Sequence, residues 1–426
     1  MGRGICFSVI FALCLSSPTR ADDVKPSPLL TTNIPAKADA PDMSKMDMAS
    51  IRDAAEQGDA KAQYYYGWVY HNGRQVGKDH VEAANWWKKS AEQGYAEAEY
   101  ILGVMYSTGM GVSQDADDAV EWWQKAADQG VAKAQYNLGL SYAKGEGVDQ
   151  DNAKAVEWYR KAAEQGDAKA ECNLAGAYFN GVGVEKNIAV ALGWYQKSAA
   201  QGNASAEYAL GTMFEDGVGV GKNIGEAFTL YRKSAEQGYA PAEYSLGLMY
   251  DGGIATEKDA DEAMVWYKKA AEQGVAKAQY NLATLYVSNP CIPRDEAASL
   301  AWYKKAADQG MAKAQYNVGL MYEHGAGVAP DAHAAFLWYQ KAGMQRNPQA
   351  QYNLANLYYT GSGITKDKVM AYAMLNLSVA GGDQEALAQR DIVEKHMTKE
   401  QIDEAQRLSR GGNFARMWNG MGDFDY

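Results

Sequence analysis

The sequence predicts an all-α protein, an α/α superhelical solenoid of about nine 36-residue helix-pair repeats with a C-terminal helical cap. Three observations predict this fold. Small and apolar residues recur with the spacing of two helices, a glycine-rich stretch separates the two helices, and a glycine returns every 36 residues. This glycine series is Gly58, Gly94, Gly130, Gly166, Gly202, Gly238, Gly274 and Gly310. An internal period of roughly 20 to 50 residues indicates stacked repeats instead of separate globular domains.

The first 21 residues have the features of a signal peptide. Arg3 supplies a positive charge, the segment 5–15 is mostly apolar, and Thr19-Arg20-Ala21 offers small residues on either side of its middle position. The apolar segment is too short for an uncleaved membrane anchor, which needs about 20 residues. We therefore expect cleavage after Ala21 and a periplasmic or secreted mature chain that has no membrane span.

Composition divides the rest of the chain into four segments. Residues 22–48 hold four of the ten prolines and no periodic apolar face, which indicates a flexible spacer. Nine repeats are expected over 49–378. Met374 and Leu375 already stand where Trp and Tyr recur, and residues 379–410 predict capping helices, because a terminal repeat leaves a core face that must be covered. Residues 411–426 are expected to form a tail.

The third repeat shows how the first helix of each pair is encoded. Ala134, Leu138 and Tyr142 lie four residues apart and form one apolar stripe of a helix. Gly139 stands beside this stripe, in a column that holds only Gly or Ala in all nine repeats. Glycine inside a helix costs up to about 1 kcal/mol relative to alanine, so its return indicates that a second helix packs close to the backbone.

The second half of the same repeat begins with a turn. The residues 145–148 read Gly-Glu-Gly-Val, and their glycines supply the positive φ angles of a tight turn. Asp151 follows in a column that holds only Asp or Asn, which predicts helix N-caps. The second helix carries Trp158 and Tyr159 on the face of its alanines, so these aromatic rings are expected to fill the core between helices instead of binding sugars.

This pattern resembles the Sel-1-like repeat family, a relative of the tetratricopeptide repeats. The resemblance is carried by 134–139, by 163–166, by the glycine turn and by 157–162, and it recurs nine times. Leu230 departs from it by replacing a tryptophan, and 289–293 replaces the glycine turn of the seventh repeat, which predicts a local kink or, alternatively, a contact point. The resemblance implies a protein-interaction scaffold, and the chain ends in the way that exported bacterial members do.

Charge and reactive residues disfavour several other functions. Without Arg3 and Arg20, the 41 basic residues fall to 39 against 53 acidic ones, and the resulting net charge of −14 disfavours nucleic acid as a partner. The five histidines stand in no metal-ligand or catalytic motif. Cys172 and Cys291 lie more than three repeats apart, so no disulfide is expected between them. We therefore expect no catalytic residues, no metal and no cofactor.

Four positions on each first helix flank the apolar stripe and remain free to contact a partner. In the third repeat they are Lys133, Asn137, Leu140 and Lys144. The second of these positions is Asn in five of the nine repeats. Asn both donates and accepts hydrogen bonds, so a row of Asn can hold the backbone of an extended peptide. Related tetratricopeptide clamps use Asn in this way, which is what the resemblance implies here, whereas the alternative is that these Asn residues satisfy neighbouring helix ends or loops.

The candidate partner-binding residues all lie on or beside this row. They are Tyr65, Trp68, Lys133, Asn137, Lys169, Asn173, Lys277, Asn281, Lys313, Asn317 and Asn353. The lysines would attract a carboxylate, and the two aromatic residues of the first repeat would anchor the N-terminal spacer or a ligand.

The sequence as a whole predicts an exported, monomeric scaffold that binds a protein or peptide through the concave face of the solenoid, in the cell envelope or outside the cell. One alternative is a cell-wall or glycan-acting enzyme or a glycan-binding module. An enzyme would require a cluster of carboxylates with shifted pKa values in a cleft. Another alternative is an adaptor of the endoplasmic reticulum, for which Asn203 and Asn376 open formal glycosylation sequons.

Overall fold

The computed structural model describes residues 47–74 and 76–410. The predicted signal peptide, all but the last two residues of the predicted spacer, and the predicted tail lie outside these residues. The chain divides between Ser234 and Ala235 into two compact parts. We call the described residues up to 234 the N-terminal part and those from 235 the C-terminal part, and each is described by itself.

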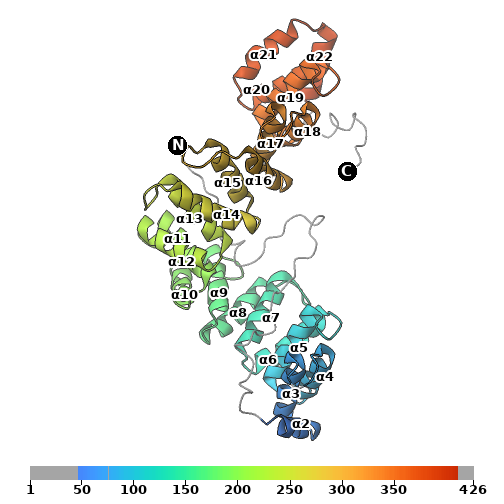
Figure 1. Ribbon diagram of the computed structural model, residues 1–426. Helices are drawn as coiled ribbons and strands as arrows, with labels where there is room; N and C mark the ends of the chain where they lie inside the picture. Colours follow the sequence, from blue (N-terminus) through green and yellow to red (C-terminus); the bar gives the residue numbers. More distant parts are fainter. Residues whose placement is uncertain (1–46, 75, 411–426) are drawn as a thin grey trace. The chain divides into compact units, whose positions relative to one another are not determined.

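Within the described residues, every regular element is a helix (Figure 1). The first helices of the nine repeats are α3 (Ala60–Asn72), α5 (Ala96–Thr108), α7 (Ala132–Lys144), α9 (Ala168–Asn180), α11 (Ala204–Asp216), α13 (Ala240–Gly252), α15 (Ala276–Ser288), α17 (Ala312–His324) and α19 (Pro348–Thr360). The second helices are α4 (His80–Ala91), α6 (Ala116–Asp128), α8 (Asn152–Glu164), α10 (Ile188–Ala200), α12 (Ile224–Glu236), α14 (Ala260–Glu272), α16 (Glu296–Asp308), α18 (Ala332–Met344) and α20 (Lys368–Ala380). The predicted fold class is thereby confirmed.

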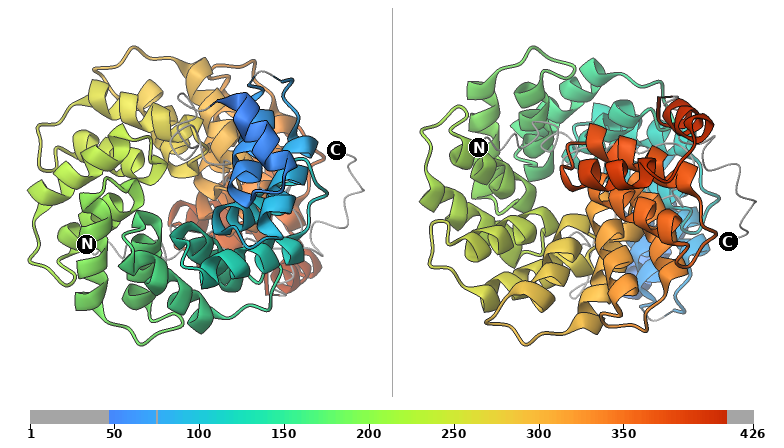
Figure 2. Two further views of the ribbon diagram at one scale, coloured as in Figure 1. Left: turned by 90° about the horizontal axis from the view of Figure 1, so that it is seen from below. Right: turned by 90° about the horizontal axis from the view of Figure 1, so that it is seen from above.

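Three further helices flank the repeats. Before them lies α2 (Met48–Glu56), which packs on α3 and whose N-cap, Asp47, accepts hydrogen bonds from two backbone amides. After them come α21 (Glu385–Glu394) and α22 (Lys399–Arg410), and both contact α20 (Figures 1 and 2). The helix α22 starts with a capping box, because Thr398 and Gln401 exchange hydrogen bonds of 2.9 and 3.3 Å.

Local chemistry sets both ends of the helices. In the third repeat, Asp151 Oδ1 accepts hydrogen bonds of 3.0 Å from the amides of Ala153 and Lys154, which would otherwise lack a partner. An Asp or Asn caps all nine second helices in this way, as the column predicts. The first helix ends at Gly145, whose φ of 76° is in the left-handed region that glycine adopts without strain.

The two helices of a repeat cross at the small-residue column. A Cβ added at Gly139 would lie 2.6 Å from the Tyr159 ring, so the glycine allows the close approach that its recurrence predicts. In the first eight pairs the deepest aromatic side chain is the one in the Tyr159 column, which is 2% exposed at Tyr159 itself. The preceding tryptophans are mostly half-buried, and in seven repeats a lysine ammonium lies 3.7–4.3 Å from the centroid of the tryptophan ring. The core is therefore centred one residue later than the tryptophan column alone would suggest.

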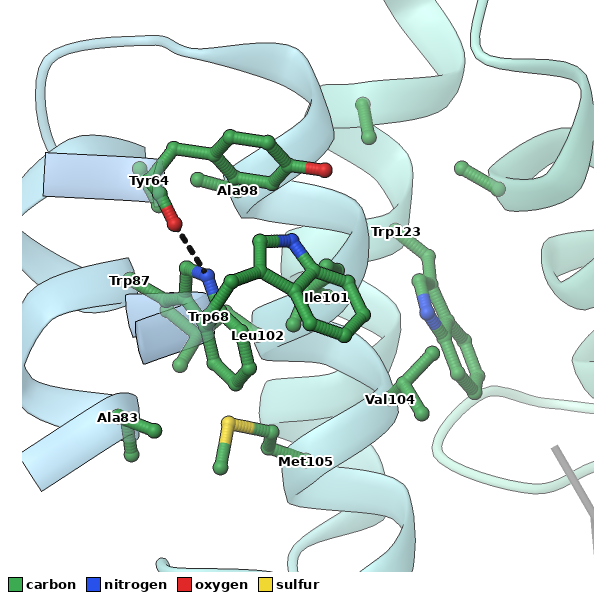
Figure 3. Packing of buried hydrophobic residues seen from close by; sticks show 14 of the residues in the cluster. Tyr64, Trp68, Ala83, Trp87, Ala98, Ile101, Leu102, Val104, Met105 and Trp123 are labelled. Carbon is green, nitrogen blue, oxygen red and sulfur yellow. Dashed lines mark hydrogen bonds between the residues drawn. The ribbon is translucent and has the colours of Figure 1, made fainter. Parts of the chain in front are cut away.

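The first repeats illustrate this packing (Figure 3). Trp87 lies 5.4 Å from Trp68 between ring centroids, and its indole Nε1 donates a 3.0 Å hydrogen bond to the Tyr64 carbonyl. Leu102 and Met105 of α5 complete the cluster, and both side chains are fully buried. Each repeat thus closes the core of the one before it, which explains why stacking stabilises helices that are only 12 or 13 residues long.

Candidate functional site

The candidate site is the row of side chains on each first helix that the sequence predicts to lie outside the core. We call it the first-helix stripe and define it by the second, sixth, ninth and thirteenth residues of each first helix. On α7 these are Lys133, Asn137, Leu140 and Lys144. The structure places the predicted site residues on this stripe in two different environments.

In the N-terminal part, the stripe is largely closed. Asn137 is 2% exposed and Asn173 is 7% exposed, and the buried Nδ2 atom of each has no hydrogen-bond partner. Lys169 is exposed, whereas Lys133 and Tyr65 are half-buried. The two asparagines therefore do not offer their amides to a partner in this structure.

Trp68 requires a correction. Its side chain is 1% exposed and packs edge-on against Tyr64 and Trp87 in the core of the first repeat (Figure 3). A ring enclosed in this way cannot contact the spacer or a ligand. The expectation that Trp68 binds a partner is wrong because α4 covers the face of α3 that carries it.

In the C-terminal part, the stripe asparagines are half-buried. Each of them hydrogen-bonds to tyrosines of the preceding repeat. Asn281 hydrogen-bonds to the hydroxyls of Tyr244 and Tyr267. Burial raises the pKa of both tyrosines, and the hydrogen bond from Asn281 partly lowers it again. The Asn column therefore has a structural contact of a kind that sequence reasoning did not name, since the partners are tyrosines and not helix ends or loops.

The same contact returns in the next two repeats. Asn317 hydrogen-bonds to Tyr303, and Asn353 hydrogen-bonds to Tyr316 and Tyr339. The hydroxyls of Tyr303 and Tyr339 in turn pair with Thr284 and Glu323 on the first helices of their own repeats. Tyr339 donates a 2.5 Å hydrogen bond to Glu323. Lys277 and Lys313 lie one turn before Asn281 and Asn317 and are exposed.

Two pockets open on the stripe of the C-terminal part. The loop pocket has a volume of about 220 Å³, and its lining includes Asp251, Lys258, Asn281, Thr284, Ser288 and Asn289. The cap pocket has a volume of about 440 Å³, and its lining includes Tyr316, Gln349, Tyr352, Asn353, Asp383 and Glu385. Each pocket thus contains one stripe asparagine together with groups from a neighbouring repeat or from the cap.

The loop pocket lies beside the irregular turns of the sixth and seventh repeats. Asn289 ends α15 in an extended conformation, with φ −91° and ψ 119°, where most first helices end in a left-handed glycine. Ala255 has a positive φ of 59° in the preceding turn. Inside the pocket, Lys258 approaches Asp251 at 3.9 Å, and Asp251 also accepts a 3.4 Å hydrogen bond from Tyr267. The predicted contact point at 289–293 therefore borders a hollow.

Apart from Asn353, sequence reasoning missed the residues of the cap pocket. Tyr316 and Tyr352 belong to a tyrosine column that returns in eight of the nine repeats, and this column was the available signal. Asp383 lies two residues before the start of α21 and accepts a 3.0 Å hydrogen bond from the amide of Glu385. No column of the repeat predicts that the loop before α21 lines the same pocket as these two tyrosines. The position of this loop depends on how α21 packs on α20.

Other reactive groups form no further site. Within the described ranges, no group of three or more His, Cys, Asp or Glu side chains could hold a metal ion. His71 and His80 lie with their ring centroids 4.9 Å apart, and burial lowers the pKa of His71 to about 4, so His71 is neutral at pH 7. Of the helices in residues 47–74 and 76–410, none has the length and apolar character needed to cross a membrane.

The stacked helix pairs, the constant period and the stripe define a helical repeat protein. The chain belongs to the Sel1 repeat family. The family model described as Sel1 repeat matches residues 60–95, 96–131, 132–167, 168–203, 204–239, 240–275, 276–311, 312–347 and 348–383. Proteins built from Sel1 repeats generally act as protein-interaction scaffolds.

Two solved structures resemble this chain closely enough to support the assignment. One is a protective antigen present in uropathogenic Escherichia coli strains and displaying an SLR fold, with 34% identity, 89% of this chain and 91% of that chain covered, and a TM-score of 0.55. The other is a Sel1 repeat protein from Oxalobacter formigenes, with 35% identity, 57% of this chain and 96% of that chain covered, and a TM-score of 0.53. A comparison with curated proteins finds no match.

Proposed function

We propose that this protein is an exported repeat scaffold that binds a protein or peptide partner through the first-helix stripe and catalyses no reaction of its own. One observation carries this proposal. Both pockets of the C-terminal part are lined by stripe residues, with Asn281 in one and Asn353 in the other. A polar surface that recurs on successive repeats of the C-terminal part suits an extended partner better than a single small substrate.

The contacts of the stripe support binding instead of catalysis. In the loop pocket, the carboxylate of Asp251 is paired with the ammonium of Lys258 and with the hydroxyl of Tyr267. These groups hold one another in place. Thr284 and Ser288 present hydroxyls whose partners are helix carbonyls and a tyrosine.

Export is part of the proposal, and it is supported by the first 21 residues, which have a positive start, an apolar core and a small-residue cleavage site. The Escherichia coli relative is a protective antigen, which fits an exported location. Cell fractionation and N-terminal sequencing of the purified protein test this part. We expect a mature chain that begins at Asp22 in the periplasmic or extracellular fraction, and an intact Met1 in the cytoplasm would contradict it.

The binding surface is tested by filling the pockets. The variants Ser288→Trp and Gln349→Trp each place a large side chain at an exposed position that lines the loop pocket or the cap pocket. Val265→Trp is the matched control, because Val265 is 47% exposed on a second helix and lines neither pocket. Each folded variant is used as bait in a crosslinking pull-down from the native envelope fraction.

The expected result is a set of partners that the wild type and Val265→Trp retain and that at least one pocket variant loses. If both pocket variants keep every partner of the wild type, the partner binds elsewhere on the chain and the proposed surface is wrong. Circular dichroism of each bait confirms that the helices are intact.

A further inference from the structure

We propose that the cap pocket binds a cationic side chain of the partner, the ammonium of a lysine or the guanidinium of an arginine. This inference rests on the proposed function and specifies the chemistry of the partner. It is carried by the aromatic rings, the charge and the hydrogen-bond direction of the groups that line the pocket.

Two tyrosine rings form the walls of the cap pocket. Tyr316 comes from α17 and Tyr352 from α19, and both line the pocket with half-buried side chains. The face of an aromatic ring carries partial negative charge and attracts cations. A volume of about 440 Å³ accommodates the long aliphatic stem of a lysine or arginine together with its charged head.

The charge of the pocket is negative. Asp383 and Glu385 line it, and among the described residues of its lining none is basic. Burial raises the pKa of Tyr316, and the negative charges of Glu323, Asp383 and Glu385 raise it further. These three carboxylates therefore act on the same point of the pocket, where a bound cation would be stabilised and an anion repelled.

The start of α21 does not offset this charge. A helix N-terminus attracts anions through its free amides. Here the amide of Glu385 already donates a 3.0 Å hydrogen bond to Asp383 Oδ1, and Ser378 donates one of 3.1 Å to Asp383 Oδ2. The helix end is thus occupied by a carboxylate of this chain, while the exposed side chain of Glu385 extends from the first turn.

The hydrogen bonds at the pocket use side-chain donors of this chain. Asn353 donates to the hydroxyls of Tyr316 and Tyr339, and Tyr339 donates onward to Glu323. The exposed carboxylate of Glu385 is the acceptor that a ligand can reach, so the ligand must supply N–H donors, as ammonium and guanidinium groups do.

The experiment uses a probe of known chemistry and the full mature chain. α-N-acetyl-lysinamide is titrated into protein labelled with ¹³C on its tyrosine rings, and the signals of Tyr316 and Tyr352 are assigned from their Phe variants. The control probe, α-N-acetyl-norleucinamide, has the same aliphatic stem without the charge. We expect both signals to shift and saturate with the lysine probe and to stay in place with the norleucine probe.

Two variants test the charge of the site. Glu385→Lys and Glu385→Gln should weaken binding of the lysine probe, the former at least tenfold. Asp391→Lys is the matched control on the same helix, because Asp391 is exposed and does not line the pocket, and it should bind as the wild type does. Equal shifts with both probes, no saturation, or undiminished binding by Glu385→Lys would each overturn the inference. Thermal melting followed by circular dichroism verifies that each variant is folded.

The failure of this inference can be told apart from the failure of the proposed function. If the partner is lost from Gln349→Trp but is held by Glu385→Lys as tightly as by the wild type, the surface is correct and the cationic ligand is wrong. If Glu385→Lys loses the partner and the lysine probe while Asp391→Lys keeps both, the inference is supported.

Discussion

The side-chain amide of Gln129 donates a 2.8 Å hydrogen bond to the buried carboxylate of Glu99. This bond joins the end of the second repeat, just after α6, to the first helix of that repeat, α5. Glu99 is 3% exposed. In the next repeat, Gln135 takes the place of Glu99. Gln165 donates to it at 2.8 Å, and Gln135 in turn donates a 3.1 Å hydrogen bond to the Ala127 carbonyl. A glutamine thus makes one hydrogen bond there that a glutamate cannot make.

Glu99→Gln is therefore expected to stabilise the protein by about 1 kcal/mol at pH 7, the net value of one additional buried hydrogen bond. Burial raises the pKa of Glu99, which means that the folded state binds the proton more tightly than the unfolded state does. The destabilisation caused by the buried charge is present above the raised pKa and is relieved as the pH falls through it. Urea denaturation at pH 7 and near pH 4 should show the advantage of the variant shrinking at the lower pH.

The control for this prediction is Glu97→Gln, because Glu97 is exposed on the same helix. It should change the free energy of unfolding by less than about 0.5 kcal/mol. An advantage of Glu99→Gln that grew toward acidic pH would contradict the assigned cause.

Adding a side chain at two glycines that lie in helices should change the free energy of unfolding in opposite directions. A Cβ at Gly211 would lie 2.6 Å from the Tyr231 ring, so Gly211→Val should lower the free energy of unfolding by about 1–3 kcal/mol through overpacking. Gly193 lies inside α10 with nothing within 4 Å of an added Cβ, so Gly193→Ala should raise it by about 0.5–1 kcal/mol. Chemical denaturation measures both, and a stabilising Gly211→Val would show that the two helices do not cross as described.

The N-cap of a second helix can be tested in isolation. Asp151→Ala removes the acceptor of two 3.0 Å hydrogen bonds at the start of α8 and should cost about 1 kcal/mol. Asp149→Ala is its control, since Asp149 is exposed in the same turn and caps no helix. Hydrogen exchange of the first amides of α8 should accelerate only in Asp151→Ala, and equal rates in the two variants would remove the capping role.

The fold could be predicted from the sequence because its determinants are local and repeat. The conformation of Gly145 and the cap at Asp151 each depend on one side chain, and nine recurrences show them clearly. The state of the stripe depends on the preceding repeat instead. Asn281 hydrogen-bonds to the hydroxyl of Tyr267, whereas Asn137 follows Trp123 in that column, and an indole nitrogen cannot accept a hydrogen bond. Asn173 follows Tyr159 and is nevertheless buried with no partner for its Nδ2 atom, so the column residue is only part of the cause.

The site could be predicted only in part for the same reason. The row of Asn281 and Asn353 was evident from the period, but the pockets that contain them arise where the period is broken, at Asn289 and at the capping loop around Asp383. Patterns within a repeat do not report the packing of segments that depart from it. The cap pocket therefore required the tertiary structure.

The tryptophan column gives the last prediction. Trp266 is 9% exposed, its Nε1 donates a 3.1 Å hydrogen bond to Glu262, and the Lys269 ammonium lies 3.8 Å from its ring centroid. Trp266→Ala should cost about 3–5 kcal/mol, because truncation of a buried aromatic side chain leaves a cavity. Lys269→Ala removes the cation–π contact and a charge near Glu243, and should cost about 0.5–1 kcal/mol. Denaturation of both variants followed by circular dichroism distinguishes the two contributions. A loss below about 1 kcal/mol for Trp266→Ala would place the tryptophan column outside the core, since such a loss is typical of an exposed side chain.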